Sequence, residues 1–325
     1  MKRVLILVVC FAISACGTTH APISPSAPSQ SPQSPVPTQR LATPTQLNPP
    51  ILPSPPTRTP APTRAPAIAI TLPPTSSPAL ETESVNLDEW QNLPVIPESI
   101  DKSLQKVYEA GLKLGNDPHA FSIFGDCQTR PGEFFGVFEQ DENVFAGLPP
   151  ELQEIVEHFR GSFTRESPTS RDGTTPGSLL WKAWHRGDFG CTFAETPVEC
   201  ELRVHRPSFV IIQVGTHFES RNTDYLRRII EQLIEAGVVP ILATKADNRE
   251  LDHRINRDMA LLASEYDLPL WNFWATVSGL PNRGLYTRSD RPLQGDIYLT
   301  DEAAHIHRMT GLEALNAVWR VVAGN

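Results

Sequence analysis

A cysteine follows a short apolar run at a point where chemistry is expected. Residues 122–134 read SIFGDCQTRPGEF, so Asp126 and Cys127 come directly after a strand-like segment. A thiolate can attack an acyl carbon when a base or a positive neighbour lowers the thiol pKa from about 8.5. The other interpretation is a small apolar side chain that closes the floor of a pocket. The residue types alone leave both interpretations of Cys127 open.

A second segment carries a candidate hydrogen-bond donor for an oxyanion. The sequence VGTHFES places Gly215 and His217 after another apolar run. An imidazole N–H can donate one hydrogen bond, and the loss of one oxyanion donor typically costs about 3 kcal/mol of transition-state stabilisation. A solvated histidine at the end of a strand is the alternative.

A third segment, QGDIYLTDEAAHIHRMTG, carries candidates for the general base. Glu302 lies three residues before His305, and His307 follows. With Cys127 these residues could act as orienting acid, base and nucleophile. The alternative is a helix that Thr300 caps, with Glu302 in its first turn and the histidines on its surface.

The elements that must position these residues alternate between strands and helices. Apolar strand-like runs separated by amphipathic segments indicate a parallel sheet covered on both faces, a three-layer α/β/α domain. Ligands in such sheets bind beyond the carboxyl ends of the strands, where both Cys127 and His217 are expected. The expected strands are 120–125, 208–215, 238–245 and 268–273, and the expected helices are 98–115, 222–237, 253–267 and 310–322.

This order of motifs resembles the SGNH/GDSL hydrolases over almost all of the folded part. The resemblance implies a mainly parallel, SGNH/flavodoxin-like sheet, an acyl-ester hydrolase activity on glycan or lipid esters, and no cofactor or metal. It places Cys127 where the family has its nucleophilic serine, after the aspartate that corresponds to Asp126. The second block of the family falls on Gly173 or Gly177.

The last block of the family can be aligned with this sequence in two registers, and each register gives a different candidate for the general base. His217 stands where the third block of the family has asparagine. In one register Asp296 matches the aspartate of the last block and Tyr298 stands where histidine belongs, although a neutral tyrosine with a pKa near 10 is a poor base. In the other register Glu302 and His305 supply the acid and the base. We weigh the Tyr298 register more heavily.

The remaining cysteines indicate the compartment. Lys2 and Arg3, an apolar run over 4–13 and the sequence ISACG predict an export signal over residues 1–15. The ISACG ending resembles a lipobox, which implies acylation of Cys16 and a lipid-anchored, extracytoplasmic protein. In an oxidising compartment Cys191 and Cys200 are expected to form a disulfide, with Cys127 unpaired.

The rest of the composition defines the domains and excludes some partners. Residues 16–80 contain more than half of the 32 prolines and no acidic residue, which predicts a disordered tether. The chain from 81 to 325 has the composition of one folded domain. The net charge of −9, without a basic stripe, argues against nucleic acid. We expect a monomer.

Two functions remain open from the sequence. The first is a membrane-tethered acyl-ester hydrolase in which Cys127 attacks and His305 serves as base. The second is a catalytically silent SGNH-like module that binds a glycan or a partner protein in the former cleft.

Overall fold

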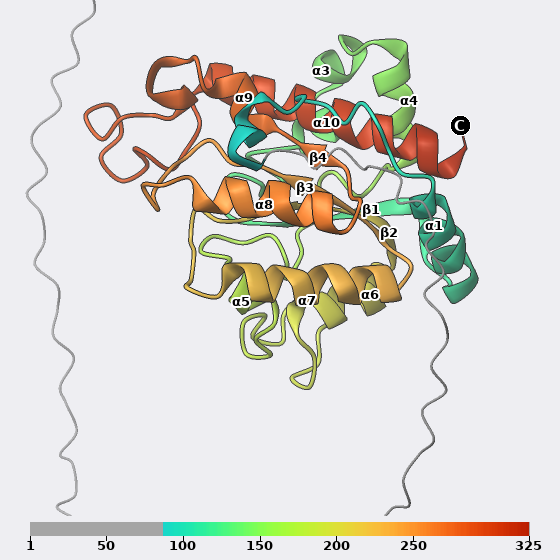
Figure 1. The fold of residues 1–325 in the computed structure, drawn as a ribbon. Coiled ribbons are helices and arrows are strands. Elements are labelled where there is room, and N and C mark those ends of the chain that lie inside the picture. The colour runs from blue at the N-terminus through green and yellow to red at the C-terminus, as the bar shows by residue number, and fades with distance from the viewer. Residues whose placement is uncertain (1–86, 325) are drawn as a thin grey trace, which may run out of the picture. The chain divides into compact units, whose positions relative to one another are not determined.

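The computed structural model describes residues 87–324, which form a sheet covered by helices on both faces (Figure 1). The expected signal peptide, the tether, Cys16 and the domain boundary near residue 81 lie outside the described residues and stay predictions. None of the helices within 87–324 is long and apolar enough to cross a membrane.

The sheet contains four parallel strands in the order β1-β2-β3-β4. Ile123 of β1 is in register with Ile211 of β2, which is in register with Ile241 of β3. The buried stretches of these strands are mostly apolar, as expected for a parallel sheet between two helical layers, and Ser122, Ser208 and Gln213 are buried polar exceptions. The bounds are β1 (Asp117–Gly125), β2 (Pro207–Gln213), β3 (Val239–Ala243) and β4 (Leu270–Trp271).

The free edge of β1 carries one further backbone pairing. Gly125 forms an isolated parallel bridge with Ser170, and the Gly125 N–H donates to the carbonyl of Thr169 at 2.9 Å. Ser170 therefore pairs with one edge of β1, and β2 pairs with the opposite edge. After β1 the chain runs first to one side of this strand and then to the other. Such a reversal leaves a crevice at the carboxyl ends of the two strands, where α/β proteins bind ligands. Cys127 and Gly215 follow these ends.

The helices form two layers around the sheet. In one layer α10 packs against α1, α4 and α9 (Figure 1). In the other layer α5 packs against α6 and α7, and α8 packs against α7 and β3. The α-helices are α1 (Ser103–Leu114), α2 (Val137–Gln140), α3 (Glu142–Ala146), α4 (Pro150–His158), α5 (Pro176–Leu179), α6 (Pro197–Val204), α7 (Asn222–Glu235), α8 (Arg254–Glu265), α9 (Phe273–Val277) and α10 (Asp301–Ala323). Two 3₁₀ helices cover Leu87–Asn92 and Pro281–Gly284. The three-layer α/β/α class predicted from the sequence is confirmed.

Local sequence signals account for the ends of several helices. Thr300 caps α10 by accepting a hydrogen bond from the N–H of Ala303 at 3.3 Å, and Thr196 forms a capping box with Glu199 at the start of α6. These caps satisfy N–H groups that have no partner within the helix. Helix α1 ends at Gly115, whose φ of 91° suits glycine.

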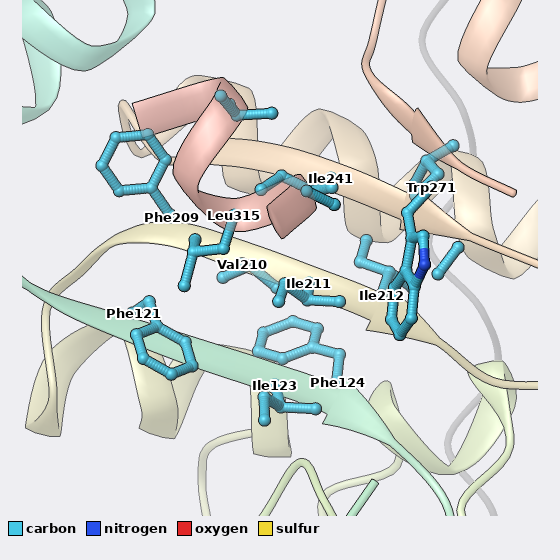
Figure 2. Close-up of a cluster of buried hydrophobic side chains, with 14 of the residues drawn as sticks. Phe121, Ile123, Phe124, Phe209, Val210, Ile211, Ile212, Ile241, Trp271 and Leu315 are labelled. Carbon is cyan, nitrogen blue, oxygen red and sulfur yellow. The ribbon is translucent and has the colours of Figure 1, made fainter. Parts of the chain in front are cut away.

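The core fills the space between the sheet and the helices. Phe121, Phe124 and Phe209 of the strands are fully buried, and Leu315 of α10 belongs to the same hydrophobic cluster (Figure 2). Burying each such side chain contributes about 1.5 to 3 kcal/mol relative to exposure. Trp271 of β4 and Phe273 of α9 are both fully buried.

A disulfide closes the loop before α6. Cys191 and Cys200 are bonded, with their Cα atoms 5.3 Å apart, and Cys127 is a free, buried thiol. Both assignments agree with the prediction from the sequence. The bond ties the loop to the first turns of α6.

Candidate active site

Asp126 is held at the end of β1 by backbone donors from two segments. Its Oδ2 accepts from the Thr216 N–H at 3.1 Å and its Oδ1 accepts from the Gln128 N–H at 3.3 Å. Only 3% of the residue is exposed. Burial, followed by the nearby charge of Asp247, raises the pKa of Asp126 to about 6. Asp126 is thus a buried carboxyl group that ionises about two pH units above its usual range, next to the candidate nucleophile.

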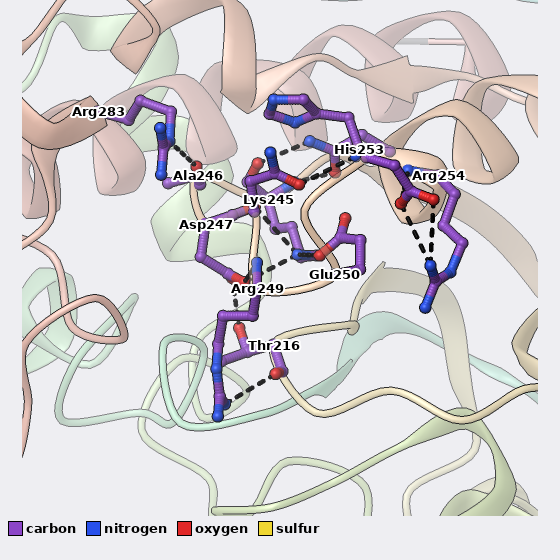
Figure 3. A network of polar contacts seen from close by, with 12 residues as sticks. Thr216, Lys245, Ala246, Asp247, Arg249, Glu250, His253, Arg254 and Arg283 are labelled. Carbon is purple, nitrogen blue, oxygen red and sulfur yellow. Dashed lines mark hydrogen bonds and ion pairs between the residues drawn. The ribbon is translucent and has the colours of Figure 1, made fainter.

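A buried polar network extends from Asp126 through Thr216 to the end of β3. Figure 3 shows its part around Thr216, Lys245, Asp247 and Glu250. The Thr216 hydroxyl donates to Asp247 Oδ2 at 2.8 Å, so this threonine bridges two carboxyl groups. Lys245 donates to Asp247 Oδ1 at 2.8 Å and to Glu250 Oε2 at 2.7 Å, and all three side chains are at most 3% exposed. The ammonium group balances part of this buried negative charge.

The thiol of Cys127 lies in a negative environment. Its Sγ–H donates to Asp126 Oδ1, with sulfur and oxygen 3.9 Å apart. Burial raises the pKa of Cys127, and the charges of Asp126, Asp172 and Asp247 raise it further. The thiolate is the nucleophilic form, so this environment opposes attack by Cys127.

Tyr298, rather than His305, belongs to the surroundings of the thiol. The Gln128 side chain donates to the Ile297 carbonyl at 2.5 Å, which joins the segment of Cys127 to the segment of Tyr298. Burial is the main cause that raises the pKa of Tyr298 to about 12. A phenol with this pKa cannot accept a proton as a base near neutral pH.

The predicted acid and base of the second register are not assembled. His305 is exposed on α10, and among residues 87–324 Cys127 has no hydrogen bond to a histidine. Glu302 is exposed in the first turn of the same helix. The helix direction places both side chains on its outer surface, as the capping alternative from the sequence predicts.

Asp296 also fails to orient a base. Its carboxylate pairs with Arg288 Nε at 3.0 Å and lies 3.4 Å from the Asn282 amide nitrogen. The residue has a φ of 62°, which turns the backbone before Tyr298. Arg288 and Asn282 therefore contact the carboxylate that the resemblance matches to the aspartate of the last block.

His307 is a core residue, not a surface residue. It is fully buried, and its Nε2 lies 2.6 Å from the Gln213 side-chain oxygen. The ring packs against Phe134, Trp271 and Phe273. Burial lowers the pKa of His307, so it is a neutral hydrogen-bonding group.

The candidate oxyanion residues lie in two different settings. His217 is half-buried after β2, and burial together with Arg249 lowers its pKa, which keeps the ring neutral. Gly215 has a φ of 132°, and a Cβ there would meet Ile255 Cγ2 at 2.4 Å. Gly173 and Gly177 line an open pocket beside α5. The glycine at 215 is required by the backbone turn.

Several residues of this site were not predicted from the sequence. Thr216, Lys245 and Asp247 link the ends of neighbouring strands. Asp172, which pairs with Arg130 at 3.0 Å, adds a negative charge that raises the pKa of Cys127. The sequence TKAD directly after an apolar strand could have indicated the Lys245 and Asp247 positions, because these strand ends meet at one edge of the sheet. No local pattern indicates Asp172.

The described part of the chain offers no metal-ligand cluster. Within residues 87–324 no group of three or more His, Cys, Asp or Glu side chains could hold an ion together. Asp247 is instead bonded to Thr216 and Lys245, and His253 packs near Trp90 and Trp274.

The comparisons with solved structures find proteins with hydrolase names. A protein assigned as an acylhydrolase, from Bacteroides fragilis, has 13% identity and a TM-score of 0.42 over 69% of this chain and 100% of that one. A GDSL-like lipase from Bacteroides thetaiotaomicron has 15% identity and a TM-score of 0.38 over 67% of this chain and 97% of that one. A protein assigned to the lipolytic G-D-S-L family, from Desulfitobacterium hafniense, has 14% identity and a TM-score of 0.37 over 60% and 99%.

No protein-family model and no curated protein matches the chain. The hydrolase names belong to the group that the sequence resembles, and they describe those proteins. The α/β/α architecture of this chain rests on its own sheet and helices.

Proposed function

We propose that the folded domain is an SGNH-like module without acyl hydrolase activity, which binds a ligand at the carboxyl edge of its sheet. One observation carries this proposal. The sulfur of Cys127 has a buried carboxyl group, Asp126, as its only hydrogen-bond partner within residues 87–324. A nucleophilic cysteine needs the opposite, a base or a positive charge that favours the thiolate.

The neighbours of the thiol support the same conclusion. Asp126, Asp172 and Asp247 all disfavour a negative charge on the sulfur of Cys127. Tyr298, with a pKa of about 12, cannot remove the thiol proton. A nucleophile and its base normally lie within hydrogen-bond reach. The geometry therefore supports a retained fold with a lost reaction.

The hydrolase remains the second candidate, because two of its features are present. Cys127 follows the first strand at the switch point of the sheet, and His217 is a neutral imidazole near the end of the second. In that mechanism the thiolate would form a thioester with an acyl group and release the alcohol, and water would then cleave the thioester. His305 would have to leave the surface of α10 to act as the base.

We also propose that the module works outside the cytoplasm, anchored through Cys16. The Cys191–Cys200 disulfide supports this location, because disulfides persist in oxidising compartments. Glycan or acyl-ester ligands follow from the resemblance.

Hydrolysis of 4-nitrophenyl acetate and 4-nitrophenyl butyrate tests the proposal. We expect the wild type to hydrolyse both esters no faster than Cys127→Ala. A wild-type rate at least about 100-fold above that of Cys127→Ala, a loss typical of a removed catalytic group, would overturn it. His305→Ala then identifies the base: a matching loss would assign His305, and an unchanged rate would exclude it. Circular dichroism confirms that each variant is folded.

A further inference from the structure

A pocket with three aromatic side chains and one carboxylate opens beside α5. Its volume is about 360 Å³, within the usual range of roughly 300–1,000 Å³ for ligand pockets. The walls come from the segment 173–184, from Glu219 before α7 and from Tyr225 in α7. Its lining residues are Gly173, Thr175, Gly177, Ser178, Trp181, Trp184, Glu219 and Tyr225.

The indole rings of this pocket have no aromatic partners of their own. Trp181 is 60% exposed, and Trp184 is half-buried. Neither ring packs against another aromatic ring within residues 87–324. The third ring, Tyr225, already has the guanidinium of Arg221 at 5.4 Å from its centre. Faces of Trp and Tyr attract cations, and this attraction grows when the cation is desolvated.

The carboxylate of Glu219 has no positive partner. It accepts a hydrogen bond from the Thr175 hydroxyl, and the Glu219 N–H donates to Asn222 Oδ1 at 2.7 Å. No Lys, Arg or His forms an ion pair with Glu219 in the described part of the chain. A half-buried carboxylate without a counter-charge favours a positively charged ligand.

The position of this carboxylate depends on a glycine. A Cβ on Gly177 would come within 2.3 Å of Glu219 Oε2, so any larger residue would displace the side chain. Gly177 leaves the space that the Glu219 carboxylate occupies, and the Thr175 hydroxyl donates a hydrogen bond to it there. The carboxylate is thus a placed group, not a freely moving surface side chain.

We propose that this pocket binds an organic cation of the quaternary ammonium class. Its aromatic rings suit the alkyl groups and the charge of such a cation, and Glu219 supplies the counter-charge. No Lys or Arg lines the pocket, which disfavours phosphate or carboxylate ligands. One oxygen of Glu219 is already bonded to Thr175, which suits a ligand without N–H donors. The inference names a ligand class for the binding module and to that extent rests on the proposed function.

The pocket adjoins the surroundings of Cys127 along the chain. Gly173 follows Asp172, whose charge raises the pKa of Cys127, and Glu219 lies two residues after His217. A ligand in the pocket therefore binds near the carboxyl edge of the sheet.

Tryptophan fluorescence titration of the full-length protein in detergent tests the proposal. The probes are choline and its uncharged isostere 3,3-dimethylbutanol, which differ in the charge alone. We expect saturable quenching by choline, with the isostere binding at least about 10-fold more weakly. Absence of saturation by about 50 mM choline, or equal binding of both probes, would overturn the proposal.

Variants separate the two contributions to binding. Glu219→Gln should bring choline and the isostere within about 2-fold of each other, because the counter-charge is lost. Trp181→Ala should weaken choline about 10-fold. Phe193→Ala, which removes a ring that is 74% exposed outside the pocket, should change neither affinity. The assigned pocket would be contradicted if Phe193→Ala lost choline binding. It would also be contradicted if Trp181→Ala bound choline as tightly as the wild type does.

Two further measurements distinguish this inference from the proposed function. Cellobiose serves as a neutral sugar probe. If cellobiose binding is lost in Trp181→Ala but kept in Glu219→Gln, the ligand of the pocket would be a glycan and not a cation. Ester hydrolysis is measured on the same samples. Choline binding together with hydrolysis would overturn the silent module and keep the pocket, whereas absence of both would keep the silent module and overturn the pocket.

Discussion

The sulfur of Cys127 lies 3.9 Å from Oδ1 of Asp126, a carboxyl group that is itself buried. The arrangement reverses the usual activation of a cysteine, because a negative neighbour opposes the thiolate. Asp126 is in turn bonded to Thr216, which joins it to Asp247. The chemistry of the thiol therefore depends on the charges of Asp126 and Asp247, which follow the ends of β1 and β3, and on that of Asp172.

Slow alkylation of Cys127 is the first expected outcome. Iodoacetamide reacts with the thiolate, and burial and the carboxylates raise the pKa of this thiol. At pH 7.5 we expect the folded protein to react at least about 100-fold more slowly than the protein in urea, whose thiol has a pKa near 8.5. Mass spectrometry of the Cys127 peptide measures both rates. Similar rates in the two states would show an accessible, activated thiol.

The pH dependence of stability provides a test of Asp126. Its pKa is about 6 in the folded protein and near 4 in an unfolded chain, so the folded state binds the proton more tightly. The resulting stability is fully present below about pH 4 and is lost as the pH rises through about 6. Relative to Asp126→Asn, the wild type should lose about 3 kcal/mol of unfolding free energy between pH 4 and 7. Urea unfolding at each pH measures this difference, and a constant difference would contradict the raised pKa.

Replacement of Lys245 tests the buried network. Lys245→Met leaves the carboxylates of Asp247 and Glu250 without their cation, and we expect a loss of about 3 to 5 kcal/mol in the free energy of unfolding. Arg254→Met is the matched control, because the pair of Arg254 with Asp252 is exposed and should contribute less than about 1 kcal/mol. Chemical unfolding measures both. Equal losses would indicate that the burial of the network adds nothing.

Removal of the disulfide tests the loop before α6. The bond closes a loop with a sequence separation of 9 residues. The double variant Cys191→Ser with Cys200→Ser should lose about 2 to 3 kcal/mol of unfolding free energy, since the unfolded chain becomes freer. Reductant should lower the melting temperature of the wild type and leave that of the variant unchanged. A reductant effect on both would point to another target.

The membrane anchor is tested at Cys16. The lipobox-like ISACG ending predicts that the mature chain begins at an acylated Cys16. Mass spectrometry of the membrane fraction should find this modified N-terminus, and Cys16→Ser should move the protein to the soluble fraction. An unmodified mature N-terminus at another residue would exclude the anchor.

Local patterns in the sequence were sufficient for the architecture. Apolar runs of strand length and amphipathic runs of helix length predicted the four strands, the helices α1, α7 and α8, and the later part of α10, which begins at residue 301 and not at the expected 310. The spacing of Cys191 and Cys200 predicted their disulfide, and Thr300 predicted the cap of α10. These features involve residues close together in the chain, so their sequence signals are direct. The short helices between β1 and β2 have no such period.

The tertiary structure alone decided what surrounds Cys127. Sequence spacing allowed either Tyr298 or His305, because both lie in one loop-to-helix segment. The bond from Gln128 to the Ile297 carbonyl brings Tyr298 toward the thiol, and the direction of α10 leaves His305 on the surface. The charges of Asp172 and Asp247 reach the thiol from segments far along the chain. A pKa depends on burial and on such distant charges, and neither is written in the local order of residues.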